Sequence, residues 1–251
     1  MISHKISIIT ATYNVGCTIL DCLTSVSKQS YINYEHLVID GLSTDLTTTI
    51  VGDFFSEKIS IYSESDNGVY DAMNKGISLS CGEIIGFLNG DDFYASDSVL
   101  YEVNKVFQNP GVDVCYANLN YVDFHDPSHI IRRWRSQNFT IGLFSKGWCP
   151  AHPTFFIRRS ALNKIGNYDL SFKMGNDVEF MLRALEVYKL NSVFIPKVWV
   201  NMRLGGISNH SLKNIFIQNF SILKALSLHE IDFSFIKFIS LKLFSRLSQR
   251  M

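Results

Sequence analysis

Two adjacent carboxylates, Asp91 and Asp92, follow closely on an apolar run at residues 84–88. Neighbouring anions repel, so a fold tolerates them best where a divalent cation or a set of hydrogen-bond donors neutralises them. Carboxylate oxygens are ligands that suit Mg²⁺ or Mn²⁺. The pair therefore predicts a metal site at the end of a strand. The alternative is a solvated turn in which these two residues cap the next helix.

A third carboxylate, Asp177, stands at the start of a helical pattern over residues 174–185. Four apolar residues follow it at the spacing of one helix face: Val178, Met181, Leu182 and Leu185. We expect Asp177 in or just before the first turn, where backbone N–H groups keep a carboxylate ionised and fixed in direction. An ordinary helix cap would have the same sequence. Glu179 and Arg183, four residues apart, are expected to form an exposed helix pair.

The elements that must position these carboxylates come from an alternation of β-rich and helical patterns. Strands are predicted at residues 5–10, 36–40, 59–63, 83–88 and 113–117, with helical faces between them. This βαβα order predicts an α/β fold, a mostly parallel sheet flanked by helices. The ligand crevice of such a sheet lies at the C-terminal ends of its strands. From residue 118 to 147 the alternation weakens, which predicts edge strands or a loop excursion over the sheet.

Composition bounds the class of protein. The chain has 251 residues, enough for one large domain or one domain with an appendage. Its 23 basic and 23 acidic side chains cancel, which removes any global case for nucleic-acid binding. Five cysteines, without a C-x-x-C pair, favour neither a zinc site nor a disulfide framework. We see no signal peptide and no apolar run long enough to span a membrane, so we expect a cytoplasmic protein.

Four motifs occur in series along the chain: ISIITATYN with VIDGLSTDLT, then SDNGVYDAMNKGI, then GEIIGFLNGDD, and a helix opening with NDVEFMLR. In this order and spacing they resemble the family-two glycosyltransferases with the GT-A fold, which include enzymes of bacterial surface polysaccharides. The resemblance covers about residues 6–208. It implies a GT-A-like sheet, a nucleotide-sugar donor over the ends of the first strands, and Mn²⁺ or Mg²⁺ as cofactor.

The resemblance also implies a set of site residues. Donor contacts would be Thr10 and Tyr13 near the nucleotide, Asp40 on the uracil, and Asp66, Lys75, Asn89 and Asp91 near the rest of the donor. Asp91 and Asp92 would hold the metal and the ribose, and Asp177 would be the catalytic base. Asn89 stands where many members have the first Asp of an Asp-x-Asp motif, a departure that removes a charge and could weaken metal dependence.

The function implied is inverting transfer of a sugar from a UDP-sugar to a hydroxyl of a lipid-linked saccharide acceptor, in bacterial surface polysaccharide biosynthesis. A metal would stabilise the charge that develops on the leaving phosphate. His152 and His210 could contact the acceptor or a phosphate, or be ordinary loop histidines. The alternatives are a nucleotidyltransferase, and a catalytically silent subunit of a polysaccharide assembly complex. The motifs do not name the sugar or the acceptor, because pocket shape sets those.

The last forty residues differ in charge from the rest. Six basic and two acidic side chains give residues 212–251 a net charge of +4, which leaves −4 for residues 1–211. Apolar residues follow helical spacing between the basic ones: Ile236, Ile239, Leu243, Phe244 and Leu247. We therefore predict a glycosyltransferase domain at residues 1–211 and a basic amphipathic tail at 212–251 that contacts the inner face of the membrane. The alternative is a helix packed on the core or on a second subunit.

Overall fold

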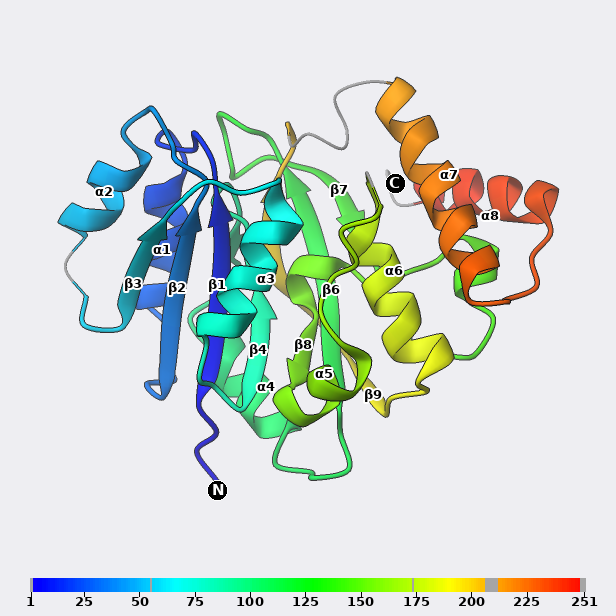
Figure 1. Cartoon of the computed structure of the whole chain (residues 1–251), viewed down its shortest axis with the longest axis horizontal. Coiled ribbons are helices and arrows are strands. Elements are labelled where there is room, and N and C mark those ends of the chain that lie inside the picture. Colours follow the sequence, from blue (N-terminus) through cyan, green and yellow to red (C-terminus); the bar gives the residue numbers. More distant parts are fainter. Residues whose placement is uncertain (1, 55, 173, 206–211, 249–251) are drawn as a thin grey trace.

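The fold is built around one mixed sheet. The computed structural model describes residues 2–54, 56–172, 174–205 and 212–248. These residues form a nine-stranded sheet in the order β3-β2-β1-β4-β8-β6-β9-β5, with β7 paired to β6 (Figure 1). The strands are β1 Ile6–Thr12, β2 Tyr34–Asp40, β3 Ile59–Ser63, β4 Ile84–Phe87, β5 Phe93–Tyr94, β6 Val114–Val122, β7 Ile130–Trp134, β8 Phe156–Arg158 and β9 Ser192–Arg203.

The N-terminal half of the sheet is parallel, as the βαβα pattern predicts. Strand β1 lies parallel to both β2 and β4, and β2 lies parallel to β3. In the other half β8 runs antiparallel to β4 and β6, whereas β9 runs parallel to β6. The weakly patterned residues 118–147 contribute the end of β6 and the edge strand β7, so the expectation of edge strands there is confirmed.

Helices cover both faces of the sheet, which confirms the predicted α/β class. They are α1 Ile19–Ser27, α2 Thr47–Asp53, α3 Val69–Leu79, α4 Val99–Val106, α5 Arg159–Ile165, α6 Asn176–Leu182, α7 Leu212–Leu228 and α8 Phe235–Ser248, with short turns η1 Phe144–Lys146, η2 His152–Thr154 and a π turn, η3, at Arg183–Val187. Along β1, Ile9 and Ala11 pack with α3, whereas Ile6 and Ile8 pack with α1. This alternation is the period of a strand buried on both faces.

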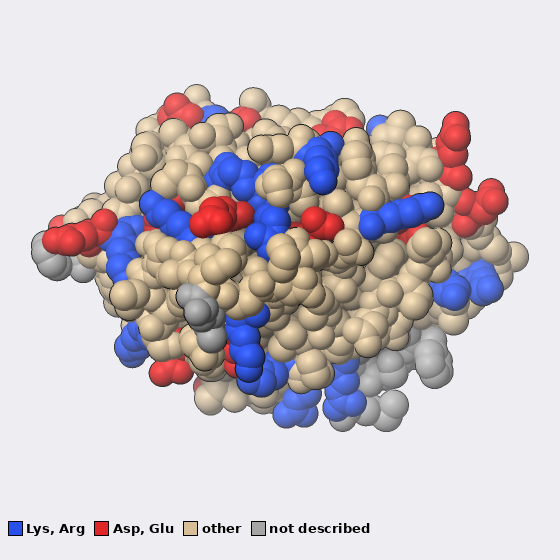
Figure 2. Space-filling view, turned by 90° about the horizontal axis from the view of Figure 1, so that it is seen from below, with Lys and Arg blue, Asp and Glu red and all other residues tan. Residues whose placement is uncertain are grey.

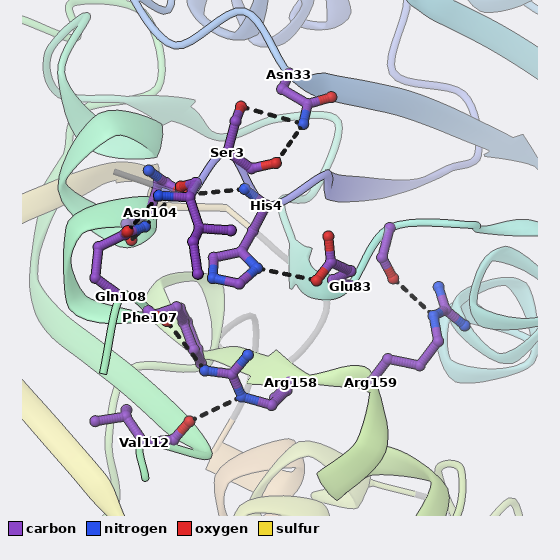
Figure 3. Close-up of polar contacts among 12 residues, drawn as sticks. Ser3, His4, Asn33, Glu83, Asn104, Phe107, Gln108, Val112, Arg158 and Arg159 are labelled. Atoms are coloured by element: carbon purple, nitrogen blue, oxygen red, sulfur yellow. Dashed lines mark hydrogen bonds and ion pairs between the residues drawn. The ribbon is translucent and has the colours of Figure 1, made fainter. Parts of the chain in front are cut away.

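Polar side chains hydrogen-bond to one another at the N-terminal ends of the parallel strands (Figure 3). The His4 N–H donates to Asn104 Oδ1 at 3.2 Å, and the His4 ring lies 2.9 Å from Glu83. Arg158 donates to the carbonyls of Val112 and Phe107, both at 3.1 Å. Positive and negative side chains are interspersed on the described surface seen from this side (Figure 2). That side therefore presents no field of a single sign to a polyanion.

The C-terminal helices α7 and α8 pack on the body of the protein next to α6 (Figure 1). Five of their residues are buried in the same core as α6: Ile222, Leu223, Ala225, Leu226 and Phe238. Ile239 is partly buried, whereas Ile236 is 78% exposed. The side chains of Leu243, Phe244 and Leu247 lie outside those that the structure describes. The sequence left open a tail that packs on the core, and the buried residues of α7 and α8 pack in this way.

One further expectation, on the pair Glu179 and Arg183, is tested by this packing. Glu179 and Arg183 do form a pair, with 2.9 Å between Arg183 Nε and Glu179 Oε1, but the expectation of an exposed pair is wrong. The Glu179 side chain is 2% exposed, and the ring of His229, just after α7, lies 2.9 Å from the same carboxylate oxygen. No helix within the described residues is long and apolar enough to cross a membrane.

Candidate functional site

A cavity of about 860 Å³ opens at the C-terminal ends of the parallel strands. Its wall is made by the loops after β1 and β4, the N-terminal turns of α3 and α6, and the strands β6, β7 and β9. Ile222 of α7 also lines it, so the C-terminal tail contributes to the wall. The site lies where an open α/β sheet is expected to hold its ligand.

The two adjacent carboxylates face different surroundings. Asp91 lines the cavity, whereas Asp92 is 0% exposed and does not. Asp92 accepts hydrogen bonds from Asn89 Nδ2 at 3.0 Å and from the Arg203 N–H at 3.2 Å. The N-cap of the following helix, α4, is Ser98, so neither carboxylate caps it. Of the two carboxylates expected to hold a metal, Asp91 is the one on the cavity wall, and a metal contact of Asp92 stays a prediction.

Burial shifts the pKa values of the Asp91 and Asp92 carboxyl groups. Burial raises the pKa of Asp91, and burial together with the neighbouring Asp91 charge raises the pKa of Asp92 well above its usual range. Arg203 partly compensates: it is 4% exposed, its Nη1 donates to the Asp91 carbonyl at 2.8 Å, and its Nη2 pairs with Asp21. A cation at Asp91 would relieve the remaining cost of the buried charges.

The geometry of the turn also depends on Gly90. A Cβ atom at this position would lie 2.9 Å from both Thr12 Cγ2 and Val15 Cγ2, closer than real Cβ contacts allow. The Thr18 hydroxyl donates to the Gly90 carbonyl at 3.4 Å. The glycine thus lets the turn that carries Asp91 lie against the loop that follows β1.

A divalent cation fits the residues present. Among the described residues, no three His, Cys, Asp or Glu side chains converge as a ready-made metal cage. Mg²⁺ needs none, because it is commonly held by one or two carboxylates together with substrate phosphates and water. Asp91, on the cavity wall, supplies such a carboxylate. The cation would neutralise phosphate charge in this part of the cavity.

Beside this turn, Tyr13 and Asp66 line the cavity as expected of donor contacts. Tyr13 is 63% exposed at the start of the loop after β1. The Asp66 carboxylate accepts a hydrogen bond from the Gly68 N–H at 2.8 Å, just before the first turn of α3. Gly41, which follows β2, has no room for a Cβ against the Asp66 carboxylate. The loops after β2 and β3 therefore meet at the cavity, and the first turn of α3 forms part of its wall.

Three expected donor contacts do not reach the cavity surface. Thr10 is 0% exposed, and its hydroxyl lies 2.8 Å from His36 Nε2 in the core. Asp40 is also 0% exposed and accepts hydrogen bonds from the Ser43 N–H at 3.0 Å and the Ser63 hydroxyl at 2.7 Å. Lys75 lies in a separate surface recess, with Nζ 3.1 Å from Glu64. Thr10 and Asp40 shape the strand ends instead of lining the site.

Asp177 lines the cavity from α6. The N-cap of α6 is Gly175, which has a left-handed φ of 79°. The interpretation of Asp177 as the N-cap is therefore wrong. Asp177 Oδ1 is buried and has no hydrogen-bond partner among the described residues. A buried carboxylate oxygen without a donor is costly, so this atom is placed to receive a proton or a hydroxyl from a ligand.

A histidine and two tyrosines surround Asp177. His152 is 7% exposed, lines the cavity, and has Nε2 2.6 Å from the Tyr168 hydroxyl. Burial lowers the pKa of His152, with the Asp177 charge opposing, which favours the neutral ring. Burial, then the Asp177 charge and a side-chain hydrogen bond with Asp177, raise the pKa of Tyr70 well above its usual range, so its hydroxyl keeps its proton. His210, the other candidate, lies outside the described residues.

Sequence reasoning missed Arg203 and Tyr70. Arg203 ends β9, and nothing in its local pattern distinguishes it from an exposed strand residue. Tyr70 carried only a weak signal, since it stands three and seven residues before Met73 and Ile77 and so resembles an ordinary core residue of the apolar face of α3. Its place on the cavity wall needs the tertiary structure.

Comparison with known proteins identifies the family. The model of glycosyl transferase family 2 matches residues 7–166. The chain belongs to this family. A PGL/p-HBAD biosynthesis glycosyltransferase of Mycobacterium bovis (strain BCG / Pasteur 1173P2) is 30% identical over 233 residues, covering 87% of this chain and 84% of the relative. An uncharacterized glycosyltransferase of Rickettsia typhi is 28% identical over 193 residues, covering 74% of this chain and 60% of the relative.

Solved structures share the fold of this family 2 enzyme. TarS (residues 1–349) of S. aureus, in complex with UDP-GlcNAc, matches with a TM-score of 0.67 at 17% identity, over 97% of this chain and 73% of that one. The mannosyltransferase PcManGT of Pyrobaculum calidifontis, in complex with GDP-Man and Mn²⁺, matches with a TM-score of 0.64 at 16% identity, over 99% and 81%. The GT-A-like fold is confirmed. The chain is a glycosyltransferase, so the nucleotidyltransferase alternative is set aside.

Proposed function

We propose that the protein is an inverting glycosyltransferase that moves a sugar from a UDP-sugar to an acceptor hydroxyl. The observation that carries this proposal is that Asp91 and Asp177, from different elements, line one cavity. One carboxylate suits a cation at the donor diphosphate and the other suits the acceptor proton. Support also comes from the structural neighbours, which bind UDP-GlcNAc and, with Mn²⁺, GDP-Man.

The chain's own residues divide the reaction between two ends of the cavity. At the donor end, Tyr13, Asp66 and the first turn of α3 contact the nucleotide and its phosphates. A divalent ion held by Asp91, when bound, neutralises charge on the leaving diphosphate. At the other end, Asp177 Oδ1 takes the proton of the acceptor hydroxyl as the hydroxyl attacks the anomeric carbon. A single direct attack inverts that centre, so an α-linked donor gives a β-linked product.

The acceptor in this proposal is a lipid-linked saccharide of a bacterial surface polysaccharide, met at the cytoplasmic face of the membrane. The mycobacterial relative is named for biosynthesis of PGL and p-HBAD. Residues 1–211 would carry the transfer chemistry and residues 212–251 the membrane contact. Phe235 and Ile236, at the start of α8, are 58% and 78% exposed and precede Lys237. Exposed apolar side chains beside a cation suit an anionic lipid surface.

Donor binding and transfer can be tested separately. A panel of UDP-sugars with Mn²⁺ should raise the melting temperature of the full chain, because a ligand that binds only the folded state stabilises it in proportion to occupancy. The stabilising donor should then release UDP in the presence of saccharide acceptors. Stabilisation by GDP-sugars and not by UDP-sugars would contradict the proposed donor. Donor binding without transfer to any acceptor would favour the silent-subunit alternative.

A further inference from the structure

The cavity has an aromatic and cationic wall that the proposed chemistry does not use. Three of its lining residues, Tyr121, Arg132 and Trp134, come from the antiparallel pair β6 and β7. Tyr121 faces Arg132 across the pair, and Trp134 is two residues further along β7. Two residues is the period of a strand, so Arg132 and Trp134 lie on the same face.

The three side chains form one stacked platform. The Tyr121 and Trp134 rings are nearly parallel, with an interplanar angle of 11° and 6.0 Å between centroids. The Arg132 guanidinium carbon lies 4.0 Å from the Tyr121 centroid and 5.7 Å from that of Trp134. Stacking fixes the plane of the guanidinium and leaves its N–H groups free to donate.

Arg132 lacks the partner that a wall cation ordinarily has. Within the described residues it takes part in none of the ion pairs. The side chain is half-buried on an edge strand and lines the cavity. A cation held over an aromatic ring, half-buried and without a carboxylate, is arranged to receive an anion in a bidentate contact.

The platform lies beyond the donor end of the site. Arg203, which holds the Asp91 and Asp92 turn, ends β9, and its neighbour Met202 pairs with Tyr121 on β6. Arg132 is therefore two strand spacings from Met202, a distance of about 10 Å. Arg132 and the turn that carries Asp91 are therefore held by different strands, so the two groups enter the cavity from separate parts of its wall and need not serve the same phosphate. A cavity of about 860 Å³ is at the large end for one ligand and can hold donor and acceptor together.

We propose that Tyr121, Arg132 and Trp134 form the acceptor subsite, and that the acceptor carries an anionic group, phosphate or carboxylate, next to its sugar. The inference rests on the proposed glycosyl transfer and adds the class of acceptor. The flat face of Trp134 packs on the apolar C–H face of a sugar ring, and Arg132 receives the anion. The platform thus selects charged acceptors over neutral ones of the same shape.

The test compares acceptors with and without an anionic group on the same hexose. Octyl hexosyl phosphates and octyl hexuronides are titrated into the full-length protein with UDP and Mn²⁺ present, beside the matching neutral octyl hexosides. Tryptophan fluorescence or calorimetry reports binding. We expect at least one anionic series to bind about tenfold or more tighter than its neutral partner, as for a charge-assisted hydrogen-bonded pair. The series that binds identifies phosphate or carboxylate as the anion.

Variants then locate the effect. Arg132→Gln should remove the preference for the anionic probe, and Arg132→Lys should restore part of it, since lysine keeps the charge but loses the fork. Arg133→Gln is the matched control, because it removes the same charge from the next position, on the other face of β7. Trp134→Leu should weaken anionic and neutral probes alike.

The outcomes are distinct. Equal binding of anionic and neutral probes, no binding of either, or an unchanged preference in a folded Arg132→Gln variant would each overturn the proposal. So would an equal loss in Arg133→Gln. Failure of the proposed function has a different signature: UDP-sugars would then not stabilise the protein, whatever the acceptor probes do.

Discussion

The two adjacent carboxylates should respond differently to the same substitution. Asp91 lines the cavity, so Asp91→Asn removes the carboxylate available to a cation and leaves the fold intact. Turnover should fall about 10²- to 10³-fold, the usual size of a lost transition-state charge contact. Asp92→Asn acts inside the protein instead. The asparagine side chain has one oxygen and one NH₂ group, so one of the two N–H donors to Asp92 would face the NH₂ group and lose its acceptor. This loss should lower the free energy of unfolding by about 1–3 kcal/mol.

Relief of buried charge offsets part of that cost. The Asp92 pKa is raised by burial and by Asp91, so the folded state disfavours the ionised form. A carboxyl whose folded pKa lies above its unfolded value of 3.8 keeps its proton longer in the folded state. Stability is therefore lost as pH rises from about 4 through the folded pKa. Removing either charge should reduce this loss, and Asp92→Asn should melt within a few degrees of wild type near neutral pH.

The assay is UDP release by full-length wild type, Asp91→Asn and Asp92→Asn over a Mn²⁺ titration, with melting curves from pH 4 to pH 8. We expect Asp91→Asn to be the inactive variant and Asp92→Asn to keep activity within about tenfold of wild type. A folded Asp92→Asn that is as inactive as Asp91→Asn would refute the reasoning, and so would full activity of Asp91→Asn in excess chelator. Wild-type melting should also rise with Mn²⁺, more than in Asp91→Asn.

Three other consequences are open to measurement. Asp177→Asn should bind the UDP-sugar with near-normal affinity in calorimetry yet transfer it at least 10²-fold more slowly, because the base acts in the transition state; lost donor binding would assign it another role. Burial lowers the pKa of His36 from 6.5 to about 3, so the unfolded state takes up a proton first and stability should fall by about 1.4 kcal/mol per pH unit below 6.5. Chemical denaturation should show a shallower fall for His36→Gln. Phe235→Ser with Ile236→Ser, both exposed, should leave the melting temperature unchanged and weaken sedimentation with anionic liposomes; unchanged sedimentation would contradict membrane contact there.

The parallel half of the sheet could be predicted because its strands are short apolar runs with clear ends. Strands predicted at residues 36–40 and 59–63 correspond to β2 Tyr34–Asp40 and β3 Ile59–Ser63. The mixed half could not, since β8 and β9 pair with partners far along the chain and carry little periodic signal of their own. Which face of α8 is buried was also beyond the sequence: Phe238, between Ile236 and Ile239, is the 0% exposed residue, because the surface of the core selects it.

The site residues show the same limit at the level of single atoms. The motif shows that Asp91 and Asp92 are adjacent in the sequence. In the folded turn the Asp91 side chain faces the cavity, whereas the Asp92 side chain faces the protein interior. The inward direction is stabilised by Arg203, 111 residues after Asp92, whose backbone N–H donates a hydrogen bond to the Asp92 carboxylate. Likewise the spacing of Glu179 and Arg183 is the same for an exposed pair and a buried one, and His229 decides between them. Because Glu179 and Asp177 share α6, the contact that buries Glu179 also fixes the helix that carries the proposed base. Motifs therefore predict which residues could carry the chemistry, whereas long-range contacts determine which carboxylate faces the cavity.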